Sequence, residues 1–282
     1  MKIAVLSDIH GNHIALRRCV DYCLEQGITR FAFLGDYVGD FAYPQKTMEL
    51  LYELNDTYDC TFLKGNKEDY WLGFHAGWNI IWRDGDSTTG TLLYNYKNLT
   101  QRDLDFFDEM PISTTLTIEG YPSITLCHGS PRRNTEKLYT HSTSTLELME
   151  ENSSSLIICG HTHRQFLFEH KNKTLANPGS VGCPIGQEGT TQFLILEASD
   201  ATWHPQLITL TYDTESVLQE LNEEKMELRA PYWTHITKRI LQGEHITHGD
   251  VLTQAMNLCK SENGFCNWPD IPEKYWKMAL QA

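Results

Sequence analysis

The sequence lacks three features that would each point to a distinct class of protein: an excess of basic residues, a long apolar run and closely paired cysteines. Its 23 Lys and Arg residues are outnumbered by 37 Asp and Glu residues, and the formal net charge is −14. Proteins that bind duplex nucleic acid usually carry a basic face, so this balance argues against that function, although bound cations would still admit a small anionic substrate. No apolar run approaches the roughly 18 residues that cross a bilayer, so we expect no membrane association.

The cysteines and the first residues bear on cellular location. The eight cysteines include no Cys-x-x-Cys pair of the kind that binds zinc. The chain meets Asp8 too early for the apolar core of a signal peptide, so we expect a cytoplasmic protein with free thiols. Cys19 and Cys23 are four residues apart and are predicted to face the core from a helix. Three others lie inside apolar runs and are predicted to be small buried hydrophobes: Cys60, Cys127 and Cys159.

Strand and helix patterns alternate over the first quarter of the chain. Short apolar runs indicate strands over Lys2–Leu6, 31–34 and 60–63, and amphipathic stripes between them indicate helices over 13–26 and 44–55. Strands that are joined by helices in this order favour a parallel sheet with helices on its faces.

The pattern then changes character twice. An aromatic stretch over 70–96 is predicted to be a helical insertion over the edge of the sheet, and a capping box at Thr100 begins a helix that ends before Pro111. A strand-rich part follows, interrupted by a helix over 143–151, with strands over 114–119, 123–127, 156–159, 165–169, 174–177, 191–197 and 206–212. Beyond Asp213 the pattern is helical, over 214–224, 232–241, 247–260 and 272–280.

Five short polar motifs occur in a fixed order, most of them directly after an apolar run. They are Asp8-Ile9-His10, Gly35-Asp36, Gly65-Asn66, His128-Gly129 and Gly160-His161-Thr162-His163. Strands that end side by side in one sheet would bring these side chains to a single edge, where open α/β sheets bind their ligands. Together the Asp, Asn and His side chains can coordinate two metal ions. Nitrogen and oxygen ligands suit Mn, Fe, Zn, Ni or Co rather than Ca.

Each motif has a simpler interpretation when it is taken alone. An Asp or His at the end of a strand is more often a cap or a satisfied polar group, and Gly-Asp and Gly-Asn pairs are ordinary turn chemistry. Gly160-His-Thr-His163 after an apolar strand is the most specific of the five. It is the combination, in this order and after such strands, that favours a metal centre.

With these motifs the chain resembles the calcineurin-like metallophosphoesterase superfamily, most closely its small bacterial and archaeal branch, over roughly residues 1–215. The matching motifs are Asp8-Ile-His10-Gly-Asn12, Gly35-Asp36-Tyr-Val-Gly39, Gly65-Asn66, His128-Gly-Ser130-Pro131, Gly160-His-Thr-His163 and Asn177-Pro-Gly-Ser-Val-Gly182. The resemblance implies an α/β fold, a four-layered α/β/β/α sandwich. We place this catalytic domain at residues 1–213 and a helical C-terminal extension at residues 214–282, which either docks on the core or mediates self-association.

The resemblance also implies a ligand set and a reaction. One metal ion would be bound by Asp8, His10, Asp36 and His163, and a second by Asp36, Asn66, His128 and His161, with Asp36 bridging. The ions would be divalent or trivalent transition metals, with Mn favoured for activity. A hydroxide shared between them would attack a phosphate ester or anhydride in line, without a covalent enzyme intermediate.

One position departs from the pattern of many superfamily members. A histidine that is proposed to protonate the leaving group often follows Gly-Asn, but here that residue is Lys67. Lysine has an unperturbed pKa near 10.4 and is a poor acid at neutral pH, so we expect weak leaving-group protonation and favour a phosphodiesterase. Phosphomonoesterase or protein phosphatase activity and dinucleoside polyphosphate hydrolysis are alternatives within this class. A non-catalytic binding or scaffold module on the same fold is the alternative outside it.

Substrate contacts are predicted from residues beside the metal motifs, for a small phosphorylated partner with nucleotides among the candidates. Catalytic roles are assigned to Asp36, Asn66, His128 and Lys67, and phosphoryl contacts to Asn12, Asn66, Lys67, Arg132 and Arg133. The alternatives are a turn residue at Asn12, a surface helix start at Lys67 and a solvated loop at the two arginines.

The aromatic insertion and the two histidines of the C-terminal extension are interpreted without a functional role. Trp71, Trp78 and Trp82 can stack a nucleobase or pack over the sheet, and we favour packing. In the related branch an arginine often stands where this chain has Ile185, so no phosphate contact is expected there. His245 and His248 are interpreted as surface residues.

Overall fold

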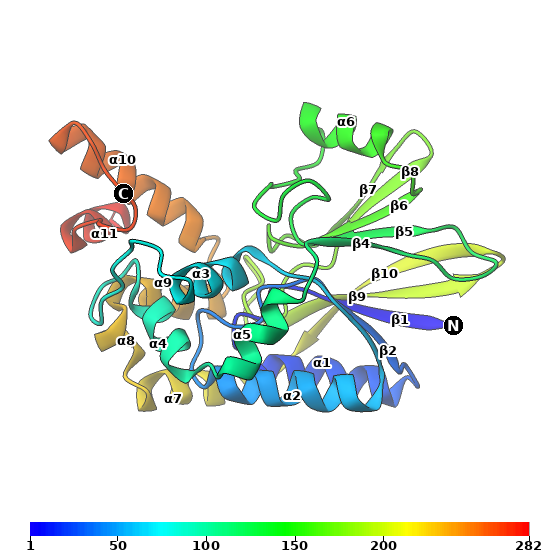
Figure 1. The fold of residues 1–282 in the computed structure, drawn as a ribbon, viewed down its shortest axis with the longest axis horizontal. Coiled ribbons are helices and arrows are strands. Elements are labelled where there is room, and N and C mark those ends of the chain that lie inside the picture. The colour runs from blue at the N-terminus through cyan, green and yellow to red at the C-terminus, as the bar shows by residue number, and fades with distance from the viewer. Residues whose placement is uncertain (282) are drawn as a thin grey trace.

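In the computed structural model, which describes residues 1–281, ten strands form two five-stranded sheets that stack face to face (Figure 1). The first sheet contains, in spatial order, β10 (Thr202–Thr211), β9 (Thr190–Ser199), β1 (Lys2–Leu6), β2 (Arg30–Phe33) and β3 (Asp59–Phe62). β1, β2 and β3 pair in parallel, whereas β9 pairs antiparallel with both β1 and β10. The parallel sheet predicted from the alternation of strands and helices is confirmed.

The second sheet has parallel strands at its centre and an antiparallel strand at each edge. Its spatial order is β4 (Ser113–Leu116), β5 (Ile124–Cys127), β6 (Leu156–Cys159), β8 (Lys173–Asn177) and β7 (Phe166–His170). β5, β6 and β8 run parallel, and β4 and β7 run antiparallel to their neighbours. β5 and β6 therefore end at the same edge, as β1, β2 and β3 do in the first sheet.

The central strands are buried on both faces, which explains why their sequences read as continuous apolar runs. In β1, Ala4 and Leu6 pack toward α1 (His13–Glu25) and α2 (Pro44–Thr57). Ile3 and Val5 point the other way and pack with the second sheet. The far face of that sheet is covered by α6 (Thr143–Glu151), through Leu148 and Met149. The molecule therefore has the predicted α/β/β/α layers (Figure 1).

Three helices lie between β3 and β4 in the sequence. They are α3 (Asn66–His75), α4 (Gly90–Asn98) and α5 (Gln101–Asp108). The insertion predicted over 70–96 is thus two helices joined by a loop, and α3 begins earlier because Asn66 already stands in its first turn. Trp71 is fully buried and Trp82 stacks on Phe74 with ring centroids 3.9 Å apart. These two tryptophans pack, as predicted, whereas Trp78 is half exposed.

The C-terminal part consists of helices that share a core of their own. They are α7 (Thr214–Glu223), α8 (Met226–Arg229), α9 (Pro231–Leu241), α10 (His248–Asn263) and α11 (Glu273–Ala279). This core includes Phe41, Tyr94 and Cys183 from the rest of the chain, so the extension packs against the loop after β2, against α4 and against the loop between β8 and β9. Figure 1 shows α9, α10 and α11 beside α3 and α4, on the side of the sheets where β1 and β2 end.

Two smaller expectations can be compared with the structure. All eight cysteines are free thiols, and burial raises the pKa of Cys19, on the inner face of α1, to about 12. Among residues 1–281, none of the helices combines the length and the apolar character that a bilayer crossing requires.

Candidate metal centre

The polar motifs lie in the loops that follow β1, β2, β5 and β6 and in the first turn of α3. Asp8, His10, Asp36, His161 and His163 all have a left-handed backbone, with φ between +54° and +66°. A residue other than glycine rarely adopts this conformation, and residues that do so gather at functional sites, where the surrounding structure holds them in place. Five such residues in one place therefore mark this edge of the sheets as a functional site.

Two loops cross at Gly35 and Gly65, and their contact sets the position of Asp36. A Cβ atom on Gly35 would overlap the backbone of Gly65, so the approach requires glycine. The Glu68 carboxylate joins the loops, because it accepts hydrogen bonds from the backbone N–H groups of Asp36 (2.9 Å), Tyr37 (2.9 Å) and Gly65 (2.8 Å). Burial, reinforced by the Asp36 charge, raises the pKa of Glu68 to about 7. The motifs do not include Glu68, although Gly65-x-x-Glu68 has the spacing of a capping box.

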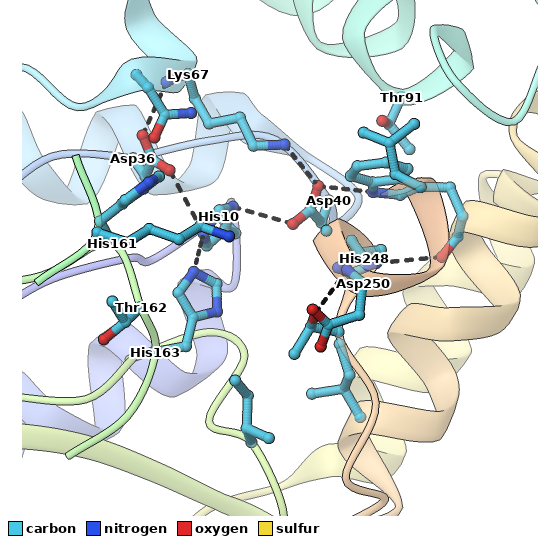
Figure 2. A pocket seen from close by; sticks show the side chains of 18 of the residues that line it. His10, Asp36, Asp40, Lys67, Thr91, His161, Thr162, His163, His248 and Asp250 are labelled. Atoms are coloured by element: carbon cyan, nitrogen blue, oxygen red, sulfur yellow. Dashed lines mark hydrogen bonds and ion pairs between the residues drawn. The ribbon is translucent and has the colours of Figure 1, made fainter. Parts of the chain in front are cut away.

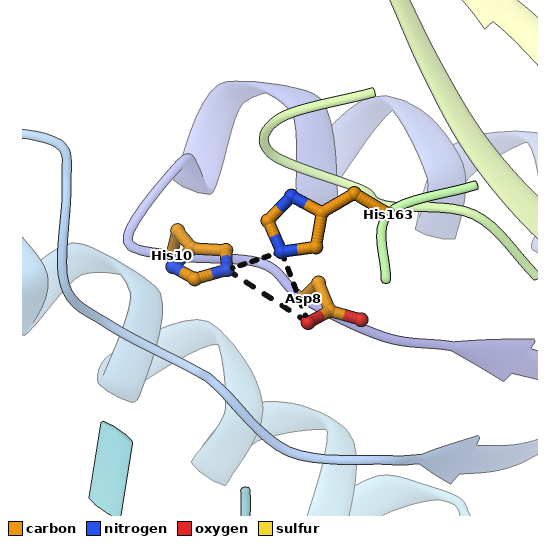
Figure 3. A group of neighbouring side chains, drawn as sticks. All are labelled: Asp8, His10 and His163. Carbon is orange, nitrogen blue, oxygen red and sulfur yellow. Dashed lines mark hydrogen bonds and ion pairs between the residues drawn. The ribbon is translucent and has the colours of Figure 1, made fainter. Parts of the chain in front are cut away.

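Asp8, His10 and His163 form the first candidate ligand group (Figure 3). Their ligand atoms lie within 4.8 Å of one another. The Nε2 atoms of the two histidines are 3.0 Å apart, and Asp8 Oδ1 lies 3.2 Å from His163 Nε2. Asp8 Oδ2 accepts hydrogen bonds from Ser7 Oγ (2.6 Å) and from the His161 backbone N–H (2.9 Å). These two bonds leave Oδ1 free to face the histidines.

Asp36, His128 and His161 form the second candidate group, and their ligand atoms again lie within 4.8 Å of one another. Asn66 joins them, with its Oδ1 atom 3.2 Å from His128 Nε2. Asp36 faces both groups, because its Oδ1 lies 3.5 Å from His128 Nε2 and its Oδ2 lies 3.8 Å from His10 Nε2. The structure thus places this carboxylate between the groups; its bridging role stays a prediction.

Three of the histidines are oriented by a partner on the ring nitrogen that faces away from the site. His128 Nδ1 lies 2.8 Å from the Leu34 carbonyl oxygen, and His163 Nδ1 lies 3.2 Å from that of Cys183. His10 Nδ1 makes an ion-pair contact of 3.0 Å with a carboxylate oxygen of Asp40, without the in-line geometry of a hydrogen bond. When Nδ1–H donates to such an acceptor, Nε2 carries the free lone pair, which is how ligand histidines are commonly held in metal sites.

This arrangement of donor atoms fits transition-metal ions. Asp8 Oδ1 is buried and finds no hydrogen-bond donor of suitable geometry within residues 1–281. His10 and His163 both direct Nδ1 outward, so their Nε2 atoms face one point, where either the proton of a charged His10 or a metal ion in its place would hold the two rings together. The mixture of imidazole nitrogen and carboxylate or amide oxygen suits the metals from Mn to Zn.

The charges of the site distinguish a histidine that must release a proton before it can bind a metal ion from one that need not. Burial alone would lower the pKa of His10, but the negative charges of Asp40, Asp8 and Asp36 outweigh it and raise that pKa to about 10. Burial, together with the neighbouring His128, lowers the pKa of His161 to about 4. At neutral pH His161 therefore already has a free lone pair, whereas a metal ion has to displace a proton from His10.

Both ligand groups open into one cavity of about 210 Å³ (Figure 2). His10, Asp36, Asn66, His161 and His163 line its polar end. Its apolar lining comes mainly from the helical insertion and the C-terminal extension, and consists of Tyr70, Leu92, Ile185, Trp233, Ile240, Leu252 and Trp268. The cavity therefore joins a metal-binding end to a surface that suits an organic group.

Lys67 also lines this cavity, and the alternative of a surface helix start is wrong. It is 9 % exposed, and its Nζ atom lies 3.3 Å from Asp40 Oδ1 and 5.0 Å from the centre of the Trp233 ring. Burial alone would lower the pKa of Lys67, but Asp40 and Asp36 outweigh it and raise that pKa. Lys67 therefore carries a positive charge inside the cavity at neutral pH.

Three predicted substrate contacts lie outside the cavity. The Asn12 side chain accepts a hydrogen bond from Ala15 N–H as the cap of α1 and donates to Tyr212 Oη at 3.0 Å, so it has the turn role of the alternative interpretation. Arg132 and Arg133 are exposed and pair with nearby glutamates rather than with the metal-binding loops. The structure does not bring these three side chains to the centre.

A second interpretation of the sequence is also wrong. His248, which we expected at the surface, is buried, lines the cavity and stacks on Trp233 with ring centroids 4.4 Å apart. Burial lowers its pKa to about 4. The sequence gives no sign of this position, because the ring that covers His248 comes from a different helix. His245, by contrast, is exposed as expected.

Comparison with known proteins agrees with this geometry. A model of the calcineurin-like phosphoesterase superfamily domain matches residues 1–201. An uncharacterised protein of Methanocaldococcus jannaschii is 26% identical over 248 residues, which cover 82% of this chain and 94% of that protein. Two crystal structures share the fold. A hypothetical protein of Pyrococcus horikoshii has a TM-score of 0.71 and 21% identity over 86% of this chain and 98% of its own. A metallophosphoesterase of Sphaerobacter thermophilus has a TM-score of 0.63 and 20% identity over 86% of this chain and 100% of its own.

Proposed function

The chain belongs to the calcineurin-like phosphoesterase superfamily, and from that premise we propose that it is a dinuclear phosphodiesterase. Membership and the two candidate ligand groups make it a metal-dependent phosphoester hydrolase. The position of Asp36 is the observation that supports two ions over one, because its two carboxylate oxygens lie 3.5 Å and 3.8 Å from histidines of different groups. Paired ions that share a ligand in this way stand about 3.5–4 Å apart in two-metal hydrolases.

The residues that would hold the ions are those of the two candidate ligand groups. Asp8, His10 and His163 would hold one, and Asn66, His128 and His161 the other, with Asp36 shared. Bound ions of this kind supply Lewis acidity to a phosphate and lower the pKa of a coordinated water from 15.7 toward about 7. The protein fixes the ligands through its strained loops and outward hydrogen bonds, so little reorganisation is needed when a substrate arrives.

Lys67 supports the choice of a diester over a monoester. Its raised pKa keeps the ammonium charged, so it can bind a phosphoryl oxygen but is a poor donor of a proton to a leaving group. His248 offers no alternative acid, because its pKa of about 4 keeps it neutral. Without an efficient general acid, esters or anhydrides with good leaving groups are the better substrates.

The cavity supports a substrate with an organic group next to the phosphate. Beyond the metal-binding end, its lining includes the side chains of Leu92, Ile185, Ile240, Leu252 and Trp268. An engineered apolar cavity of about 150 Å³ holds benzene, so about 210 Å³ admits a phosphate with a compact group rather than a large one. A nucleotide would therefore extend through the mouth of the cavity.

The experiment reconstitutes the protein with Mn²⁺ and compares its rates on matched aryl phosphate diesters and monoesters, with Asp36→Asn as the blank. A strong preference for the diester, with two ions bound per chain, is the expected result. A preference for the monoester would overturn the phosphodiesterase assignment and favour a phosphomonoesterase or protein phosphatase. Hydrolysis of a dinucleoside polyphosphate alone would favour the polyphosphate hydrolase. No activity above the blank would favour the scaffold module.

A further inference from the structure

The three candidate ligand histidines that are oriented through Nδ1 differ in the charge of their acceptors. His128 and His163 point to backbone carbonyls, whereas His10 points to the Asp40 carboxylate at 3.0 Å. Asp40 also holds the main chain of His10, because its N–H donates to the His10 carbonyl oxygen at 2.8 Å. Asp40 therefore fixes both the ring and the backbone of this ligand.

Asp40 is itself held by two donors that arrive from other parts of the molecule. Its Oδ1 atom accepts hydrogen bonds from Lys67 Nζ at 3.3 Å and from Trp233 Nε1 at 2.9 Å. Figure 2 shows Asp40 between His10 and Lys67. Asp40 is 1 % exposed, and a carboxylate this deeply buried needs such partners to remain ionised. Burial would raise its pKa, but the charges of Lys67 and His10 outweigh burial and hold that pKa well below its usual range.

Trp233 belongs to α9 of the C-terminal extension and stands 193 residues from Asp40 in the sequence. Its ring stacks on His248 at 4.4 Å between centroids, and Lys67 Nζ lies 5.0 Å from its centre. These two contacts help to fix the plane of the indole, whose N–H donates to Asp40 Oδ1. The extension thereby reaches a candidate metal ligand through a single intervening residue.

A carboxylate on the outer nitrogen of a ligand histidine orients the ring and makes the coordinating nitrogen more basic. We propose that Asp40 and Trp233 are positioning residues for His10, through which the C-terminal extension completes the ligand group of Asp8, His10 and His163. The inference rests on the metal centre of the proposed function and adds that the extension takes part in metal binding. Neither residue needs to touch the substrate for this role.

The test measures the Mn²⁺ affinity of the full-length protein by calorimetry. Trp233→Phe keeps an aromatic ring over His248 and removes the indole N–H, and we expect one of the two Mn²⁺ sites to weaken about 3- to 10-fold. Asp40→Asn removes the charge and should weaken the same site about 10- to 100-fold. The matched control is Trp203→Phe, which removes another buried indole N–H, donated to the Pro122 carbonyl oxygen at 2.8 Å and away from the cavity. It should leave both sites unchanged.

A double variant separates positioning from general damage to the fold. If Trp233 acts through Asp40, Asp40→Asn combined with Trp233→Phe binds Mn²⁺ no more weakly than Asp40→Asn alone. Additive losses, or equal losses in Trp233→Phe and Trp203→Phe, overturn the inference. If the Asp40 variants do not fold, the two single tryptophan variants decide. A wild-type protein that binds no Mn²⁺ would overturn the proposed metal centre as well, whereas unchanged binding by Trp233→Phe would overturn the positioning role alone.

Discussion

The two sheets and the C-terminal extension contribute different things to one site. The loops at the sheet edges and the first turn of α3 supply all seven candidate ligands, and most of these lie in a polar motif directly after an apolar run. The extension supplies no candidate ligand, yet Trp233, His248 and Trp268 line the cavity beside the centre. Chemistry and shape thus come from separate parts of the chain. Only the part that carries the chemistry has a recognisable sequence signature.

Loss of the shared ligand would be the largest effect, and it tests the role of the sheet edges. We expect Asp36→Asn to lower kcat/KM more than about 100-fold, because this change disturbs both ligand groups at once. The measurement is hydrolysis of an aryl phosphodiester at saturating Mn²⁺. Asp59→Asn is the control, since that carboxylate is 59% exposed and pairs with Arg30. A variant within tenfold of the wild-type rate would contradict the assignment of Asp36.

Lys67 stands where the two regions meet, and its removal should have the next largest effect. Lys67→Met keeps the length of the side chain but removes the charge beside the phosphate, and we expect kcat/KM to fall about 10- to 100-fold. Steady-state kinetics at saturating Mn²⁺ would show this mainly as a higher KM. Lys64→Met serves as the control, because Lys64 pairs with Asp69 at 3.2 Å. Unchanged kinetics on every substrate would exclude contact between Lys67 and phosphate.

Substrate preference tests the contribution of the extension. Trp268 lines the cavity and stacks on Tyr70 with ring centroids 5.5 Å apart. We expect Trp268→Ala to lower kcat/KM for an aryl diester about 5- to 20-fold, because an aromatic contact is lost, and to affect a dimethyl ester less. Phe265→Ala, at a residue that is 67 % exposed, is the control. Equal losses on both esters would show that Trp268 supports the fold and does not select the substrate.

The smallest effect is on stability and appears only in acid. The folded-state pKa of His248 is about 4, below its ordinary value of 6.5, because burial disfavours the charged ring. Between these two pKa values His248 is protonated in the unfolded chain but not in the folded chain. The free energy of unfolding therefore falls as the pH drops from about 6.5 toward 4. At pH 5 this amounts to about 2 kcal/mol, or a few degrees in Tm.

The comparison is between thermal melts at pH 7 and pH 5. His248→Gln should reduce the loss of Tm between these two pH values, and His245→Gln, at an exposed position, should not change it. An unchanged acid slope in His248→Gln would mean that the His248 ring is accessible to water.

The strands could be predicted from the sequence because burial on both faces leaves an apolar run of the same length. β1 (Lys2–Leu6) and β6 (Leu156–Cys159) match their predicted bounds, and the motifs at their ends led to the ligand groups. The supporting residues could not be found in this way. Asp40 lies in an ordinary-looking loop, and its role depends on Trp233, 193 residues away. His248 was predicted at the surface because the residues next to it in the sequence give no indication that the Trp233 ring of α9 covers it.

The long sequence separation between Asp40 and Trp233 has a consequence for protein synthesis. Ribosomes extend a chain at about 5–20 residues per second, starting from the N-terminus. All seven candidate ligands precede α9, so they are already made when Trp233 is still to be translated. During that interval Asp40 lacks its indole donor and His10 is held less firmly. A nascent chain would therefore acquire its full metal affinity only after α9 has emerged and docked.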